Sequence, residues 1–290
     1  MSEAILQLDG VTKRYGDHLA VDDVSFEVPD GAVYGLLGPN GAGKSTTIRM
    51  IMRIIGMDSG SIELDGAPVD DDRRRLIGYL PEERGLYRKM KVLEHLVYLG
   101  TLRGVGPGEA KRRASAWLDK LDLGDWAGHK VEDLSKGMQQ KVQFIGTVLH
   151  RPRMLILDEP FSGLDPINTR ELKDLMLAMS RDGVTVVLST HVLPQVDELC
   201  THICLNNRAR KILEGPLSNI RSDYGGNVWR IHTDLAAEAI AELPGVIATR
   251  PLGEELLVEL TDDAGPRELM RRLVQRGEVV SFTRFVPDLE

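Results

Sequence analysis

Cysteine is scarce in this chain, with two residues among 290, and no run of about 18 apolar residues occurs in it. The first absence excludes the disulfide framework of a small secreted domain, and the second excludes a transmembrane helix. The N-terminal stretch Met1 to Ala4 also lacks the basic start and apolar core of a secretory signal. We therefore expect a cytosolic protein.

A strong positive charge is missing as well, since the formal net charge is −8 and no basic stripe appears. This balance argues against a nucleic-acid partner, and we expect none. The local triplet Arg73 to Arg75 is more simply a solvated helix face than a binding patch. An apolar fraction of 42% fits a globular protein with a sizeable core, and the length suggests one large domain plus a small one, or two comparable domains.

The two cysteines, Cys200 and Cys204, flank His202 and could suggest a metal site. A second pair of ligands is missing, however, and the spacing suits an apolar junction between a helix and a strand. We expect two buried, reduced thiols and no metal at this place.

Residues 38 to 46 complete the phosphate-loop pattern G-x-x-x-x-G-K-[ST]. Glycines let successive backbone N–H groups point at phosphate oxygens, Lys44 reaches the β- and γ-phosphates, and the Ser45 hydroxyl ligates Mg²⁺. The apolar run 33–37 predicts a strand before the loop, and residues 44–55 have helical spacing after it. A chance Gly-rich turn is the alternative, but this context favours nucleoside triphosphate binding by Gly38, Pro39, Asn40, Gly41, Ala42, Gly43, Lys44, Ser45 and Thr46.

The surrounding chain has an α/β pattern. Alternating residues predict antiparallel strands at 5–8 and 24–28, and unbroken apolar runs predict strands buried on both faces. Helical periodicity occupies about 85–150. The remaining expected elements are strands at 60–66, 77–80, 154–157 and 184–188, a loop at 103–108 and a helix at 169–179.

A domain boundary is expected near residues 222–226, which divides the chain into 1–222 and 227–290. The second part has alternating strands at 228–233 and 256–260, an amphipathic helix at 266–276 and a last strand at 279–286. It therefore predicts a small α+β domain.

Two carboxylates and an imidazole narrow the chemistry. Asp158 ends an apolar strand, where it can hold the Mg²⁺ that bridges the phosphates, and Glu159 can polarise a water in line with the γ-phosphate. His191 follows another strand and is expected at the same edge of the sheet. Ser135 precedes a helix, where its hydroxyl and nearby N–H groups offer a second anion site, although a Ser N-cap is commonplace.

With these motifs in fixed order, the chain from about Ile5 to Ile220 resembles the ATP-binding-cassette ATPases, the motor subunits of ABC transporters. The resemblance implies a P-loop NTPase core with an antiparallel β subdomain and a helical signature subdomain. Tyr15 matches the aromatic residue that stacks on adenine, Asp165 the D-loop aspartate and His191 the switch histidine. Ser135, Lys136, Gly137, Met138 and Gln139 correspond to the family signature LSGGQ.

The resemblance also implies an ATP- and Mg²⁺-dependent ATPase that forms head-to-tail homodimers around two ATP molecules. Each ATP would sit between one subunit's phosphate loop and the other's signature serine, with Glu159, His191 and Lys44 as catalytic residues. A separate multi-spanning permease would be the membrane partner, holding the ATPase on the cytoplasmic face of the membrane. A soluble ABC ATPase that acts on ribosomes or DNA is the alternative, but this chain lacks a second cassette or long coiled coil.

Two departures from the family pattern stand out. Pro81-Glu82 occupies the place where a glutamine is common, so Glu82 joins Ser45 and Asp158 as a candidate Mg²⁺ ligand. In the signature, Lys136 and Met138 replace glycine and glutamine. The segment 81–87 and the small C-terminal domain resemble the branch of ABC-2-type exporters such as sodium-extrusion ATPases. No motif encodes the cargo or the direction of transport. The role of residues 228–290 is not encoded in a motif either, and regulation and dimer stabilisation are the two alternatives.

Overall fold

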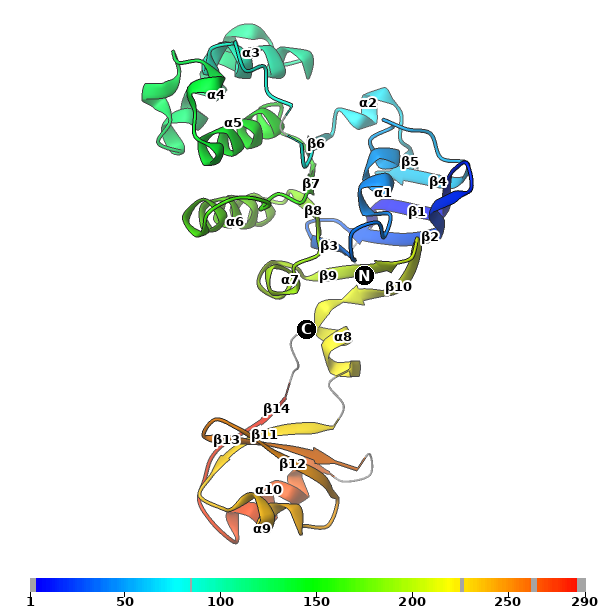
Figure 1. Cartoon of the computed structure of the whole chain (residues 1–290), viewed down its shortest axis with the longest axis vertical. Coiled ribbons are helices and arrows are strands. Elements are labelled where there is room, and N and C mark those ends of the chain that lie inside the picture. Colours follow the sequence, from blue (N-terminus) through cyan, green and yellow to red (C-terminus); the bar gives the residue numbers. More distant parts are fainter. Residues whose placement is uncertain (1–3, 84, 225–226, 262–264, 286–290) are drawn as a thin grey trace. The chain divides into compact units, whose positions relative to one another are not determined.

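The chain was analysed as a computed structural model that describes residues 4–83, 85–224 (of 222–224 the backbone only), 227–261 and 265–285. It divides into two compact units, residues 1–216 and 217–290 (Figure 1). The boundary expected near 222–226 lies a few residues beyond this division, and residues 225–226 of it are outside the described part.

An antiparallel sheet opens the first unit. Its strands β1 (Ala4–Tyr15), β2 (His18–Pro29), β4 (Ser59–Leu64) and β5 (Ala67–Pro68) run in the order β2-β1-β4-β5. The pairing expected between residues 5–8 and 24–28 is confirmed, since Leu6 lies opposite Val28 and Leu8 opposite Phe26. The tight turn at residues 16–17 brings Tyr15 opposite His18, and register shifts interrupt the pairing between this turn and Leu8.

A six-stranded sheet forms the centre of the unit. Its order is β10-β9-β3-β8-β7-β6, parallel throughout except that β10 is antiparallel to β9. Every residue of β3, β7 and β8 is buried, as unbroken apolar runs predict for strands covered on both faces. The strands are β3 (Val33–Leu37), β6 (Ile77–Leu80), β7 (Met154–Asp158), β8 (Thr185–Thr190), β9 (His202–Asn207) and β10 (Arg210–Pro216).

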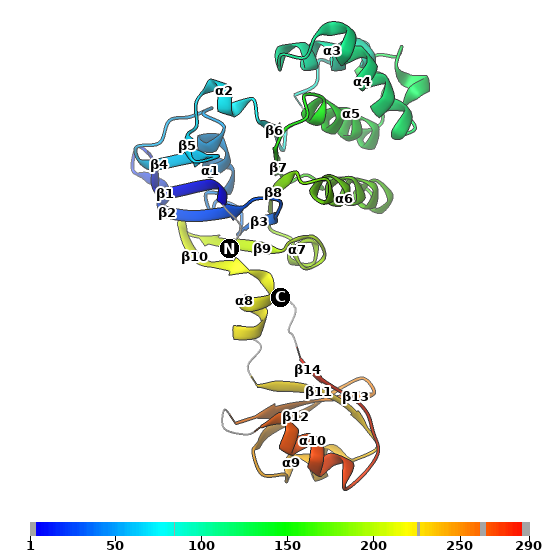
Figure 2. The same cartoon turned by 180° about the vertical axis from the view of Figure 1, so that it is seen from behind.

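Helices cover both faces of this sheet. Helix α1 (Lys44–Ile51) lies between the two sheets, where Ile48 and Ile51 join a core shared by both, while α6 (Pro166–Arg181) and α7 (Leu193–Leu199) lie on the other face (Figure 2). The helix expected to reach residue 55 ends at Ile51, because Arg53 adopts a left-handed backbone with φ of 53°. The short α2 (Asp71–Arg74) carries Arg73 and Arg74, which are half-buried, and the exposed Arg75 follows at its C-terminal end.

The helical segment expected at 85–150 contains α3 (Val92–Leu102), α4 (Pro107–Lys120) and α5 (Lys136–Val148), with short 3₁₀ turns at Gly124–Trp126 and Val131–Asp133. Leu96, Ala114 and Leu118 are fully buried, as apolar residues at helical spacing are expected to be. The loop expected at 103–108 is shorter, because α4 starts at Pro107, and proline suits the first turn of a helix.

The second unit begins with α8 (Leu217–Tyr224) and continues as a β-α-β-β-α-β unit. Its antiparallel sheet has the order β12-β13-β11-β14, and the α+β expectation is confirmed. Residues of both later helices join one core with the sheet, among them Ile240 and Leu269. The elements are β11 (Val228–Thr233), α9 (Ala237–Ala241), β12 (Val246–Leu252), β13 (Glu255–Leu260), α10 (Pro266–Val274) and β14 (Val279–Arg284). The end predicted for the last strand, Val286, lies outside the described residues.

Both cysteine thiols are buried and free, as expected, and burial raises the pKa of Cys200 and of Cys204 to about 12. Among the described helices, none has the length and apolar composition that a membrane crossing needs.

Candidate active site

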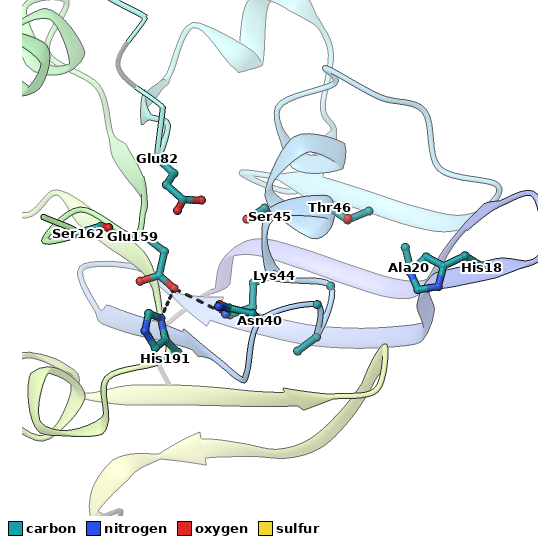
Figure 3. Close-up of a pocket in the computed structure, with 13 residues that line it drawn as sticks. His18, Ala20, Asn40, Lys44, Ser45, Thr46, Glu82, Glu159, Ser162 and His191 are labelled. Atoms are coloured by element: carbon teal, nitrogen blue, oxygen red, sulfur yellow. Dashed lines mark hydrogen bonds and ion pairs between the residues drawn. The ribbon is translucent and has the colours of Figure 1, made fainter.

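The ends of three parallel strands bring the sequence motifs together. Leu37 of β3 pairs with Thr190 of β8, and Asp158 of β7 pairs with Ser189, so the loops after these strands leave from one edge of the sheet. A cavity of about 480 Å³ opens there (Figure 3). It is lined by His18, Ala20, Asn40, Gly41, Ala42, Gly43, Lys44, Ser45, Thr46, Glu82, Glu159, Ser162 and His191.

Glycine is required at two points of the phosphate loop. Gly38 and Gly43 have φ values of 146° and 94°, which other residues rarely adopt. A Cβ on Gly38 would lie 2.2 Å from the carbonyl oxygen of Asn206, and one on Gly43 would lie 2.4 Å from that of Ala20. At these two points the loop backbone therefore lies too close to neighbouring carbonyl oxygens for a side chain to fit. The loop leads directly into the N-terminus of α1, where N–H groups favour an anion.

Lys44 supplies a nearly buried positive charge, with 6% of the residue exposed. Its Nζ atom donates to the carbonyl oxygens of Gly38 and Pro39, at 2.6 and 3.3 Å, and lies 3.7 Å from Oε1 of Glu159. These contacts hold the ammonium group at the cavity wall, in reach of the loop that would wrap the phosphates.

Asp158, at the end of β7, accepts hydrogen bonds from two hydroxyl groups. Ser45 donates to its Oδ1 atom over 3.2 Å, and Ser189 donates to the same oxygen. Burial, together with the nearby Asp158 charge, raises the pKa of Tyr79 to about 12, so this phenol stays protonated. A carboxylate and a hydroxyl in direct contact are hard oxygen donors, which is the set that Mg²⁺ prefers.

Glu159 is directed into the cavity by an unusual backbone. Its φ is 47°, and its N–H donates to the carbonyl and the hydroxyl oxygens of Ser189, at 3.2 and 3.1 Å. Because a left-handed residue changes the direction of the chain, the Glu159 side chain diverges from that of Asp158. Its Oε1 atom lies 2.9 Å from Nδ1 of His191 (Figure 3). This arrangement suits a general base that is oriented by a second group.

Glu82 reaches the cavity from the segment after β6 (Figure 3). The carbonyl oxygens on either side of it, of Pro81 and Glu83, accept hydrogen bonds from Nε2 of Gln143 at 3.2 and 3.4 Å. Gln143 belongs to α5, so the helix that starts at the signature also holds the Glu82 segment. The sequence interpretation missed Gln143, because no local pattern signals a contact across 60 residues.

Tyr15 and Asp165 are not among the residues that line the cavity, nor are Gly38, Pro39 and Asp158, which contact the lining residues Lys44 and Ser45. Tyr15 is 48% exposed at the end of β1 and is not among the residues that line the cavity. His18, which pairs with Tyr15 across the hairpin, lines it instead. Asp165 caps α6 away from the lining, accepting from the N–H of Asn168 at 3.0 Å. The strand register is the only signal that could have drawn attention to His18.

The signature segment is also separate from this cavity. Ser135 caps α5, and its hydroxyl accepts from the N–H of Met138 at 3.2 Å. Of the described residues that line the cavity, none comes from 135–139. The two helix starts that the sequence interpretation offers as anion sites, at Lys44 and after Ser135, are therefore not brought together in one chain.

This fold and site define a P-loop nucleoside triphosphatase. The pattern of the ABC transporter family matches residues 21–162, and that of the ATP-binding protein DrrA1-3-like C-terminal domain matches 215–290. The chain is 39% identical to the uncharacterized ABC transporter ATP-binding protein YhaQ of Bacillus subtilis, over 98% of this chain and 96% of that one. The chain belongs to the ABC transporter ATP-binding proteins.

Two further comparisons are informative. The chain is 35% identical to the Nod factor export ATP-binding protein I of Cupriavidus metallidurans, over 80% of this chain and 78% of that one. It is also similar to a solved dimeric ATP-binding cassette bound to ADP and phosphate after hydrolysis, with 25% identity and a TM-score of 0.66 over 73% of this chain and 98% of that one. The expectation of an ATP-binding, ATP-hydrolysing ABC transporter subunit is confirmed.

Proposed function

We propose that this chain hydrolyses ATP as one half of a head-to-tail homodimer and thereby drives a separate membrane permease that exports its cargo. The observation that carries the dimer is the separation of the two anion sites. Lys44, Glu159 and His191 face one cavity, whereas Ser135 starts a helix outside it. A second copy, turned head to tail, supplies the missing signature to the cavity.

The related dimeric cassette supports this assembly, because it is a dimer with both hydrolysis products, ADP and phosphate, bound. A cavity whose residues come from two chains also explains how nucleotide binding and assembly are linked. Each ATP would join the two subunits, so nucleotide binding stabilises the closed dimer.

Within the cavity, we assign the roles as follows. Backbone N–H groups of residues 38–46 and the Lys44 ammonium hold the phosphates, and Tyr15 or His18 contacts the base. Ser45, Asp158 and Glu82 would hold Mg²⁺, which supplies charge neutralisation at the phosphates when bound. Glu159 accepts a proton from the attacking water, and His191 keeps the Glu159 carboxylate in place.

Export is supported by a relative, the Nod factor export ATP-binding protein I, whose name gives export as its activity. The permease would be a separate chain, and it would hold this one on the cytoplasmic face of the membrane. We assign the second unit, residues 217–290, a role in regulation or in stabilising the dimer, since none of the lining residues of the cavity comes from its described part.

The test uses Glu159→Gln, because an amide keeps the shape of the side chain but cannot take the proton. This variant should bind ATP, lose turnover and accumulate as a dimer in size-exclusion chromatography with ATP, whereas ADP should leave it monomeric. A chain that stays monomeric at saturating ATP contradicts the proposed assembly. Co-purification from detergent extracts with a multi-spanning membrane protein tests the permease.

A further inference from the structure

The side chain of Asn168 lies between two segments that are expected to act on the partner's nucleotide. It belongs to the first turn of α6, and its backbone N–H donates to Oδ1 of Asp165 at 3.0 Å. Its Nδ2 atom donates to Oδ2 of the same carboxylate. Both oxygens of Asp165 are therefore engaged by one residue, and the hydrogen bonds from Asn168 hold the pKa of Asp165 below its usual range. Asp165 is thus an ionised, fixed cap.

The other side of the Asn168 amide packs against Gly137 of the signature segment. A Cβ built on Gly137 would lie 2.4 Å from Nδ2 of Asn168, 2.7 Å from Cγ and 2.8 Å from Oδ1. A Cβ atom does not come this close to a nonbonded heavy atom, so only glycine fits at 137 while the amide keeps its place. Gly137 is itself buried, in the first turn of α5 beside Ser135.

Further contacts join the same two segments. Nε2 of Gln140, on α5, donates to the carbonyl oxygen of Pro160 at 3.1 Å, one residue after Glu159. Nζ of Lys141 lies 2.5 Å from Oε2 of Glu171, one turn further along α5 and α6. The signature helix and the segment from Glu159 to α6 are therefore connected at three successive points, of which Asn168 is the nearest to the start of both helices.

We propose that Asn168 is a positioning residue that sets the signature and Asp165 of one subunit in a fixed relation, so that both meet the partner's ATP as one surface. This inference rests on the proposed head-to-tail dimer. Asn168 does not line the cavity of its own chain, so its effect belongs to dimer closure and turnover rather than to nucleotide binding by a single subunit.

The experiment is a double-mutant cycle of Gly137→Ala and Asn168→Ala in the full chain, made in the Glu159→Gln background. ATP-dependent dimer affinity is measured by sedimentation, and ADP binding reports on the single subunit. Each single variant should weaken the dimer by about tenfold or more, while ADP affinity stays within about twofold. In the double variant the Cβ of residue 137 finds room, so the loss should be smaller than the product of the single losses by at least about threefold.

Two further variants separate a change of charge beside Asp165 from a general effect of substitution on α6. Asn168→Asp preserves the shape against Gly137 but places a second carboxylate beside Asp165, so it should weaken the dimer more at low ionic strength than at high. Asp174→Ala, on an exposed part of the same helix, should change nothing. Turnover of the Asn168 variants without the Glu159 change should fall in kcat with little change in KM.

The outcomes separate the two proposals. If Glu159→Gln itself forms no dimer with ATP, the proposed function fails. If it does, and the effects of Gly137→Ala and Asn168→Ala simply multiply, or ADP binding falls with them, then Asn168 has only a structural role and the inference is wrong.

Discussion

Nδ1 of His191 and Oε1 of Glu159 lie 2.9 Å apart, although the residues come from the ends of different strands. The same Oε1 atom is 3.7 Å from Nζ of Lys44. One carboxylate oxygen thus has two partners, and the contact with His191 is the shorter. His191 is therefore placed to hold the base against the pull of the buried ammonium group.

From this geometry, His191→Ala should lower kcat with little effect on ATP affinity, because Glu159 loses the group that orients it. The loss should not exceed the factor of about 10² to 10⁴ that a positioned general base contributes. His191→Gln, which retains a hydrogen-bond donor, should recover part of the loss. Steady-state phosphate release measures both variants. Equal rates for alanine and wild type would remove His191 from the mechanism.

Lys44→Ala should weaken ATP binding, because the β- and γ-phosphates lose a cationic partner while the loop glycines remain. A hydrogen bond to a charged group contributes about 1.5–3 kcal/mol, so the dissociation constant should rise by about 10- to 100-fold. Calorimetric titration gives the value. Lys111→Ala, which removes an exposed lysine on α4, is the matched control and should leave the affinity as it was.

Tyr15 and His18 face each other across the hairpin, and only His18 lines the cavity. If Tyr15 stacks on adenine, Tyr15→Ala should cost about 1–3 kcal/mol of ATP affinity, the value of an aromatic ring stacked on a base. Inorganic triphosphate should bind Tyr15→Ala and wild type equally, since it has no base. A loss of ATP affinity for His18→Ala alone would instead assign the base contact to His18.

Acid sensitivity should arise in part from His95. This residue is fully buried on α3, and neither ring nitrogen has a hydrogen-bond partner within the described part of the chain. Burial lowers its pKa from 6.5 to about 4. Between these values the unfolded chain takes up a proton that the folded chain does not, so the free energy of unfolding falls as the pH drops through this window.

His95→Leu should therefore reduce the loss of stability between pH 6.5 and 4, by up to about 3 kcal/mol. Urea denaturation at a series of pH values measures it. His129→Leu replaces an exposed histidine and should leave the pH dependence in place. A parallel pH dependence for His95→Leu and wild type would contradict the assignment. His150, whose pKa burial also lowers to about 4, accounts for a further part of the dependence.

Much of the fold and of the site follows from short-range patterns. The phosphate loop, Asp158 with Glu159, and His191 each stand directly after a buried apolar run, and parallel strands end at one edge of a sheet. A local pattern therefore fixes both the residue and its place. The contact of Gln143 with the Glu82 segment is different, since it depends on how α5 packs against a segment 60 residues earlier.

The strand β12 was missed for a related reason. Its sequence, Val246 to Leu252, contains Pro251 and alternates poorly, because it lies at the edge of its sheet and pairs only with β13. An edge position tolerates proline and weak burial, so the pattern that reveals buried strands is absent there. The end of α1 was misjudged because a left-handed Arg53, which the apolar spacing does not signal, ends the helix.

Glu82 and Lys136 are the two places where this chain departs in charge from the family pattern. Glu82 lines the cavity beside Glu159, and Lys136 is exposed in the first turn of α5, next to Ser135. In a head-to-tail dimer, Lys136 would come from the partner to the same γ-phosphate. The carboxylate adds one negative charge near the phosphates, and the lysine adds one positive charge, so we expect the two to compensate in the closed state.

A double-mutant cycle decides whether they do. Glu82→Gln and Lys136→Gly, singly and together, are compared by ATPase rate and by ATP-dependent dimer affinity. If the two side chains share one site, the coupling energy should exceed about 0.5 kcal/mol, and it should shrink as salt is raised because exposed charges are screened. The matched control pairs Lys136→Gly with Glu83→Gln, which changes an exposed carboxylate one residue away and should be additive. Additive effects for Glu82 as well would mean that Lys136 faces solvent in the dimer and that Glu82 acts on the metal alone.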